Sequence, residues 1–151
     1  MFTFDFDSKE LMKLYDTLNA FGEDFEKQCL EGTLKECGQV VADKMKSNIE
    51  SATNKGYATG ESARSVKATL KKKKGVLTGV EIYPRGNASG GKKNTRGDKL
   101  RNMDKICYLE FGTSKESAHP VMQPAISSSQ KEVQDIMLND FKKYAKEKGL
   151  I

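Results

Sequence analysis

One long apolar stripe constrains the first third of the chain more than any other feature of the sequence. Its members recur at steps of mostly three and four residues between positions 11 and 49, which is the period of one helix face. Glycine weakens a helix interior, so we expect a break near Gly22. The pattern predicts a short helix followed by a long one ending near Ala52. The stripe consists of Leu11, Leu14, Tyr15, Leu18, Phe21, Phe25, Cys29, Leu34, Cys37, Val41, Met45 and Ile49.

The residues before this stripe carry a different pattern. Phe2, Phe4 and Phe6 alternate with polar residues, which indicates a short strand or an apolar anchor arm. Asp7 and Glu10 have the spacing of a capping box at a helix start.

The middle of the chain predicts a loop, a helical turn and a hairpin. Residues 53–60 contain turn-forming residues, and Thr59 can cap a short helical turn that runs through Arg64. Segments 66–72 and 76–83 then form the two strands, with the turn at Lys73-Lys74-Gly75. Pro84 ends the second strand because proline has no N–H for the ladder.

The segment from residue 105 to residue 111 predicts a further strand. Leu109 and Phe111 fall on one face of an extended chain, and Gly112 permits the positive φ that ends it. Pro124 suits a first helical turn, so the last helix is expected over 124–148. Its apolar stripe consists of Ile126, Val133, Ile136, Met137, Phe141 and Tyr144.

Together these elements predict an α+β fold in a single domain spanning residues 1–151. A long N-terminal helix and a C-terminal helix are expected to pack on a small, mainly antiparallel sheet. Residues 85–103 lack periodicity and are rich in Gly, Asn, Ser, Lys and Arg, so we expect a long, flexible and disordered basic loop.

Composition narrows the class of protein. The chain is 36% hydrophobic and 31% charged, which is typical of a protein that either leaves segments disordered or completes its burial against partners. No apolar run approaches the roughly 20 residues of a membrane span, and no basic-then-apolar leader pattern is recognisable. The expectation is a soluble protein of the cytoplasm.

The net charge of +5 is unevenly distributed. The stretch from Lys67 to Lys105 holds twelve Lys or Arg residues and three acidic ones, a local +9, whereas the remainder is −4. Two clusters are candidates for contact with DNA or with an acidic partner. For the first, a solvated hairpin tip is the competing interpretation. They consist of Lys71, Lys72, Lys73 and Lys74, and of Lys92, Lys93 and Arg96.

Catalytic, metal and cofactor sites are not indicated. Cys29, Cys37 and Cys107 lack the paired spacing of a zinc site and are expected to be reduced and to serve packing. His119 has no orienting partner that the sequence nominates, and packing near the sheet edge is the simpler interpretation. Glu110 is either a contact at a subunit boundary or a solvent-facing strand residue.

Two short motifs resemble a known family. Tyr108-Leu109-Glu110-Phe111-Gly112-Thr113, followed by His119-Pro120 and by Pro124-Ala125, is similar to a motif of tailed-phage neck and tail-completion proteins, the gene-product-ten-like family of lambdoid phages. The stretch from Thr59 to Val66 resembles the second motif, with Ser62 where a leucine is usual. The resemblance makes motif and interface candidates of Thr59, Gly60, Ser65, Glu110, Phe111, Gly112, Thr113, His119, Pro120 and Pro124.

The resemblance implies a structural virion protein at the head–tail junction, not an enzyme. Members of the family form a ring of copies that joins the head connector to the tail. The implied partners are further copies of the chain, other head-completion proteins, and tail-terminator or tail-tube proteins, with nonspecific contact to genomic DNA as an option. The alternative is a sequence-nonspecific nucleic-acid-binding module that uses the basic hairpin and loop.

Overall fold

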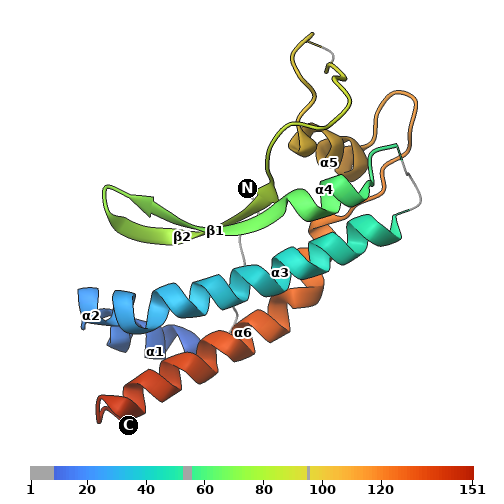
Figure 1. Cartoon of the computed structure of the whole chain (residues 1–151). Coiled ribbons are helices and arrows are strands. Elements are labelled where there is room, and N and C mark those ends of the chain that lie inside the picture. Colours follow the sequence, from blue (N-terminus) through green and yellow to red (C-terminus); the bar gives the residue numbers. More distant parts are fainter. Residues whose placement is uncertain (1–8, 53–55, 95) are drawn as a thin grey trace. The chain divides into compact units, whose positions relative to one another are not determined.

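The computed structural model describes residues 9–52, 56–94 and 96–151 (Figure 1). The arm expected over residues 1–7 lies outside these ranges, as does Asp7 of the expected capping box. The fold is α+β, as predicted, with helices and one two-stranded antiparallel sheet. Contacts divide the described residues into two compact units: residues 9–40, 69–81 and 129–151 form the first, and residues 41–52, 56–68, 82–94 and 96–128 form the second.

The N-terminal helices confirm the predicted break. Helix α1 covers Lys9–Asn19, and a short helix α2 follows at Glu23–Phe25 after Gly22. Gly22 has a φ of 56°, which a glycine adopts without steric cost. A π-helical turn at Glu26–Leu30 leads into α3, Glu31–Ser51, which ends next to the predicted boundary.

The first unit has an aromatic core. Phe25 and Phe141 meet edge to face with ring centroids 5.2 Å apart, a favourable geometry for two aromatic rings. The hydroxyl of Tyr144 donates to the Asp24 carboxylate at 2.6 Å, so the polar end of this core is also satisfied. The buried members of the core are Leu11, Leu18, Phe25, Cys29, Phe141, Tyr144 and Ala145.

Two short helices and parts of longer elements make up the second unit. Helix α4 covers Gly60–Ser65, strand β1 covers Val66–Lys73 and strand β2 covers Val76–Pro84, close to the predicted positions. Helix α5 covers Asn102–Phe111, and α6 begins at Met122 and ends at Glu147. The core of this unit comprises Ala42, Met45, Ile49, Ala58, Ala63, Val66, Ile106, Leu109, Val121, Met122 and Ala125.

The strand predicted over residues 105–111 is wrong, because these residues belong to α5. The alternation of Leu109 and Phe111 favoured a strand, but the buried positions recur at steps of three and four. Asp104 also accepts a hydrogen bond from the backbone N–H of Arg101 at 2.9 Å, which satisfies a free donor at the helix start. The sheet therefore has two strands. The buried residues of α5 are Asn102, Lys105, Ile106, Leu109 and Glu110.

The basic loop before α5 has hydrogen bonds between its two arms. The N–H of Ala88 donates to Leu100 O, and the N–H of Leu100 donates to Lys92 O, both at 2.8 Å. Antiparallel bridges join Asn87 to Arg101 and Lys93 to Lys99. Leu100 is buried. The expected disorder of residues 85–103 stays a prediction, and these contacts favour an ordered base.

Candidate assembly surface

The Thr59–Val66 motif forms α4 and its N-terminal cap. The hydroxyl of Thr59 accepts from the N–H of Ser62 at 3.1 Å, as predicted for a capping residue. Ser62 is fully buried and donates its hydroxyl to Tyr57 O at 2.9 Å. Ser65 closes the helix by donating to Ser62 O at 2.7 Å. Ser62 therefore satisfies local backbone groups at the position where a leucine is usual.

Glu110 caps the last helix from a distance in the sequence. Its carboxylate accepts hydrogen bonds from the backbone N–H groups of Val121, Met122 and Gln123 at 2.7, 2.8 and 3.0 Å. These groups lie at the start of α6, where backbone donors have no partner within the helix. Glu110 is 6% exposed, so the interpretation as a solvent-facing strand residue is wrong.

Gly112 and Thr113 shape the loop between α5 and α6. Gly112 has a φ of 75°, and a Cβ built on it would lie 2.9 Å from Ala118 N and from Glu116 O. The hydroxyl of Thr113 accepts from the N–H groups of Lys115 and Glu116. The position therefore requires glycine both for its backbone angle and for its close neighbours.

Phe111 is an exposed aromatic residue of the other motif. Its side chain is 71% exposed, although Leu109 and Glu110 beside it are buried. It occupies the last position of α5, immediately before the tight turn at Gly112. An exposed aromatic ring beside buried neighbours is a candidate for a protein–protein contact, where aromatic residues are enriched.

A hollow of about 420 Å³ lies within the same unit. His119 and the two prolines of the motif, Pro120 and Pro124, line it together with Ala52 and Ala118. The side-chain amide of Asn48 donates to Val121 O at 3.0 Å and supports its wall. The backbone N–H of His119 donates to Leu109 O at 2.7 Å. The motif residues thus supply both an exposed ring and a mainly apolar hollow.

The lysine cluster of the hairpin is partly neutralised within the first unit. Lys71 pairs with Glu81, and Lys72 pairs with Glu31. The ammonium of Lys72 holds the pKa of Glu31 below its usual value, and Glu31 in turn raises the pKa of Lys72. Lys73 ends β1, and Lys74 occupies the turn with a φ of 52°.

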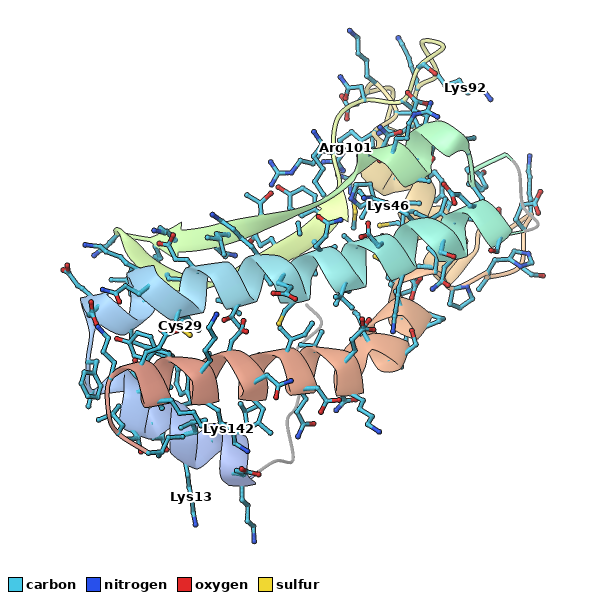
Figure 2. The ribbon with its side chains drawn as sticks, turned by 60° about the horizontal axis from the view of Figure 1, so that its bottom comes forward. Lys13, Cys29, Lys46, Lys92, Arg101 and Lys142 are labelled. Carbon is cyan, nitrogen blue, oxygen red and sulfur yellow. The ribbon has the colours of Figure 1, made fainter. Side chains whose placement is uncertain are left out.

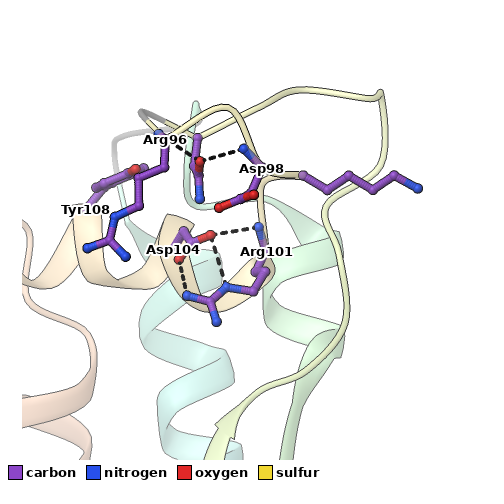
Figure 3. A pocket seen from close by; sticks show the side chains of 7 residues that line it. Arg96, Asp98, Arg101, Asp104 and Tyr108 are labelled. Carbon is purple, nitrogen blue, oxygen red and sulfur yellow. Dashed lines mark hydrogen bonds and ion pairs between the residues drawn. The ribbon is translucent and has the colours of Figure 1, made fainter.

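The second cluster lies in the loop of the other unit. The side-chain oxygen of Asn94 accepts from the N–H groups of Arg96 and Asp98, which forms a tight turn. Arg96, Asp98 and Tyr108 line a polar hollow of about 480 Å³ (Figure 3). In Figure 2 the side chain of Lys92 points away from the helices of this unit. Lys92, Lys93 and Arg96 are all exposed.

Two ion pairs remove further charges from the basic stretch. The guanidinium of Arg101 donates to Asp104 at 2.8 Å and lowers the pKa of that carboxyl (Figure 3). Lys105 is 6% exposed and donates to Glu61 at 3.1 Å. Both cations contribute to the local charge of +9 in the sequence, since a charge count reveals neither burial nor pairing.

Glu61 is a structural residue that the sequence analysis did not identify. Its carboxylate accepts from the N–H of Ser89 at 2.8 Å and from Lys105, so it joins α4, the basic loop and α5. The Ser89 N–H, followed by the Lys105 ammonium, lowers the pKa of Glu61. Its partners Ser89 and Lys105 lie 28 and 44 positions away, so no local sequence pattern predicts these contacts.

The three cysteines are free thiols in the described part of the chain. Cys29 and Cys37 are buried, and burial raises the pKa of the Cys37 thiol to about 12. No group of three or more His, Cys, Asp or Glu residues is arranged to hold a metal ion among residues 9–52, 56–94 and 96–151. Within those same ranges, no helix combines the length and apolarity that crossing a membrane requires.

Comparison with known proteins gives one clear result. A family model described as "Bacteriophage HK97-gp10, putative tail-component" matches residues 12–121, which cover most of the chain, the Thr59–Val66 motif and the other motif as far as Pro120. Searches of curated proteins and of solved structures found no significant match. The chain therefore belongs to the HK97-gp10-like family of phage tail components.

Proposed function

We propose that this protein is a neck or tail-completion component at the head–tail junction of a tailed phage. In this proposal it is a non-enzymatic part of the virion, made in the host cytoplasm and assembled as a ring of copies between head connector and tail. Membership of the tail-component family supports the structural role. The partners are neighbouring copies and the adjoining head-completion and tail proteins.

The observation that carries the proposal is the exposure of Phe111 within the family motif. An aromatic side chain that is 71% exposed serves no purpose in the core of its own unit. Aromatic residues are enriched at the centres of protein–protein contacts, where they contribute much of the binding energy. The hollow lined by His119, Pro120 and Pro124 offers a second surface on the same unit.

A ring of identical subunits requires two different surfaces on each copy. Such heterologous contacts close when each copy inserts one surface into the other surface of its neighbour. Phe111 and the hollow at residues 118–124 are separate features of one chain, so they satisfy this requirement in principle. We assign the contact between copies to these two features.

The nucleic-acid-binding alternative gains no support from these observations. Four cations of the basic stretch, at positions 71, 72, 101 and 105, pair with carboxylates of the same chain. The family description names a tail component and no nucleic acid. Lys92, Lys93 and Arg96 of the loop are exposed and are compatible with either a protein or a DNA partner.

Deletion of the gene from the parent phage tests the proposal directly. Negative-stain microscopy of the lysate should show filled heads and separate tails, and the gene supplied in trans should restore joined particles. Intact infectious particles from the deletion would contradict a junction role. Salt-dependent DNA binding by the purified protein would then become the leading hypothesis.

A further inference from the structure

A hollow of about 400 Å³ lies in the second unit and is distinct from the two hollows described above. Its lining comes from α4, from the start of β1, from the base of the basic loop and from the first residue of α5. Arg64, Lys67, Arg85 and Asn102 are the residues that give it its chemical character. None of these four residues belongs to the two lysine clusters, and Arg64 alone lies within the Thr59–Val66 motif.

The rim of this hollow is positively charged. Arg64 and Lys67 are exposed, and neither forms an ion pair in the part of the chain that the structure describes. The guanidinium of Arg85 lies 4.8 Å from the centroid of the Tyr83 ring. Glu61, the carboxylate in the lining, is already engaged by Ser89 and Lys105. The site therefore favours an anionic ligand.

Asn102 adds a second requirement. It is 3% exposed, and its side-chain N–H donates to Arg85 O at 2.9 Å, which establishes the orientation of the amide. The remaining side-chain oxygen is buried and has no hydrogen-bond partner among the described residues. Buried polar atoms are nearly always paired in folded proteins, so this oxygen calls for a donor.

The two requirements discriminate between classes of ligand. A phosphodiester backbone offers acceptor oxygens but no donor, so it satisfies the cations and leaves the Asn102 oxygen unpaired. An acidic polypeptide carries carboxylates and also backbone N–H donors. Carboxylates pair well with arginine and lysine through charge-assisted hydrogen bonds. The chemistry of the hollow matches the polypeptide.

We propose that this hollow binds an acidic segment of a partner protein. A carboxylate of the segment pairs with Arg64 and Lys67, and a backbone N–H of the segment donates to the Asn102 oxygen. The Asn102 oxygen is covered in the free protein. Binding therefore requires neighbouring side chains to move and expose this oxygen to the donor. The proposed occupant is an acidic segment of a different protein, so the proposal does not depend on ring formation.

Fluorescence anisotropy with the purified full-length protein tests the charge requirement. The probe is a fluorescein-labelled hexaglutamate peptide. Replacing both cations (Arg64→Ala with Lys67→Ala) should raise its Kd by at least about tenfold, given the strength of charge-assisted hydrogen bonds. The charge-matched control, Lys143→Ala with Lys146→Ala, should change Kd by less than about threefold, because these two exposed lysines of α6 do not line the hollow. Circular dichroism verifies that both variants fold.

Two further measurements test the donor requirement. The peptide methylated at its backbone nitrogens should bind more weakly than the parent peptide. The parent peptide should also shift the side-chain amide signals of Asn102 in a nitrogen-15 correlation spectrum. Equal losses in the two double variants, unmoved Asn102 signals, or equally tight binding of a short DNA duplex would each overturn the proposal.

Discussion

At the scale of single residues, Glu110 supplies the cap that the sequence before α6 lacks. Val121 precedes the helix and has no side-chain acceptor for the free backbone donors. The Glu110 carboxylate accepts three of these N–H groups and places a negative charge at the positive end of the helix. An acidic residue is therefore required at this position for the fold itself.

Glu110→Gln should destabilise the protein by about 1–3 kcal/mol, because the amide cannot accept all three hydrogen bonds and carries no charge. Urea unfolding would show a lower midpoint with an unchanged slope. Glu36→Gln is the matched control, since Glu36 is exposed on α3. Equal midpoints for the two variants would contradict the capping role.

Gly112 presents a second requirement at the scale of a residue. Gly112→Ala should be more destabilising than Gly90→Ala, although both glycines have a positive φ, of 75° and 87°. A Cβ at Gly112 meets backbone atoms at 2.9 Å, whereas a Cβ at Gly90 meets nothing within 4 Å. We expect a difference of at least about 1 kcal/mol between the variants, measured by urea unfolding. Equal losses would show that backbone strain alone decides the cost.

At the scale of elements, Glu61 joins α4, the basic loop and α5, and this linkage predicts a pH dependence. The Ser89 N–H and the Lys105 ammonium lower the pKa of Glu61 from its ordinary 4.5 in the folded protein. As pH falls below that value, the unfolded chain takes up a proton first. The contribution of Glu61 to stability is therefore complete above pH 4.5 and is lost as pH falls through the lower folded pKa.

Glu61→Gln should consequently lose less stability than the wild-type protein between about pH 6 and pH 3. Urea midpoints at the two pH values give the comparison. Glu36→Gln is again the control, because it removes an exposed carboxylate that joins no elements. A pH profile for Glu61→Gln that parallels the wild type would exclude Glu61 as the linking residue.

The N-terminal helices could be predicted from the sequence, whereas the helical structure of α5 could not. The stripe from Leu11 to Ile49 spans many turns, so local periodicity decided α1 and α3 correctly. The segment 105–111 is short, and its alternation at Leu109 and Phe111 imitates a strand. Phe111 does not fit the apolar stripe that a buried helix face would show, because its side chain is exposed at the end of α5.

At the scale of the whole molecule, the residues of the candidate site divide between the two units. The motif residues and the loop cations belong to the second unit, whereas Lys71 to Lys74 belong to the first. The motif positions were accessible from the sequence because the resemblance identified them. The roles of Glu61, Lys105 and Asn102 were not, because pairing over 17 to 44 positions leaves no local pattern.

The assembly role predicts that Phe111→Ser separates folding from function. Phe111 is 71% exposed, so its loss should change the free energy of unfolding by less than about 0.5 kcal/mol. If the ring is a centre of the contact between copies, joined particles should fall by at least about tenfold when the variant gene complements the deletion phage. Met12→Ser is the matched control, because Met12 is an exposed apolar residue of α1 at 49% and lies outside both motifs. Full complementation by Phe111→Ser, with the deletion phage still unable to join heads to tails, would move the contact to another surface and leave the junction role intact.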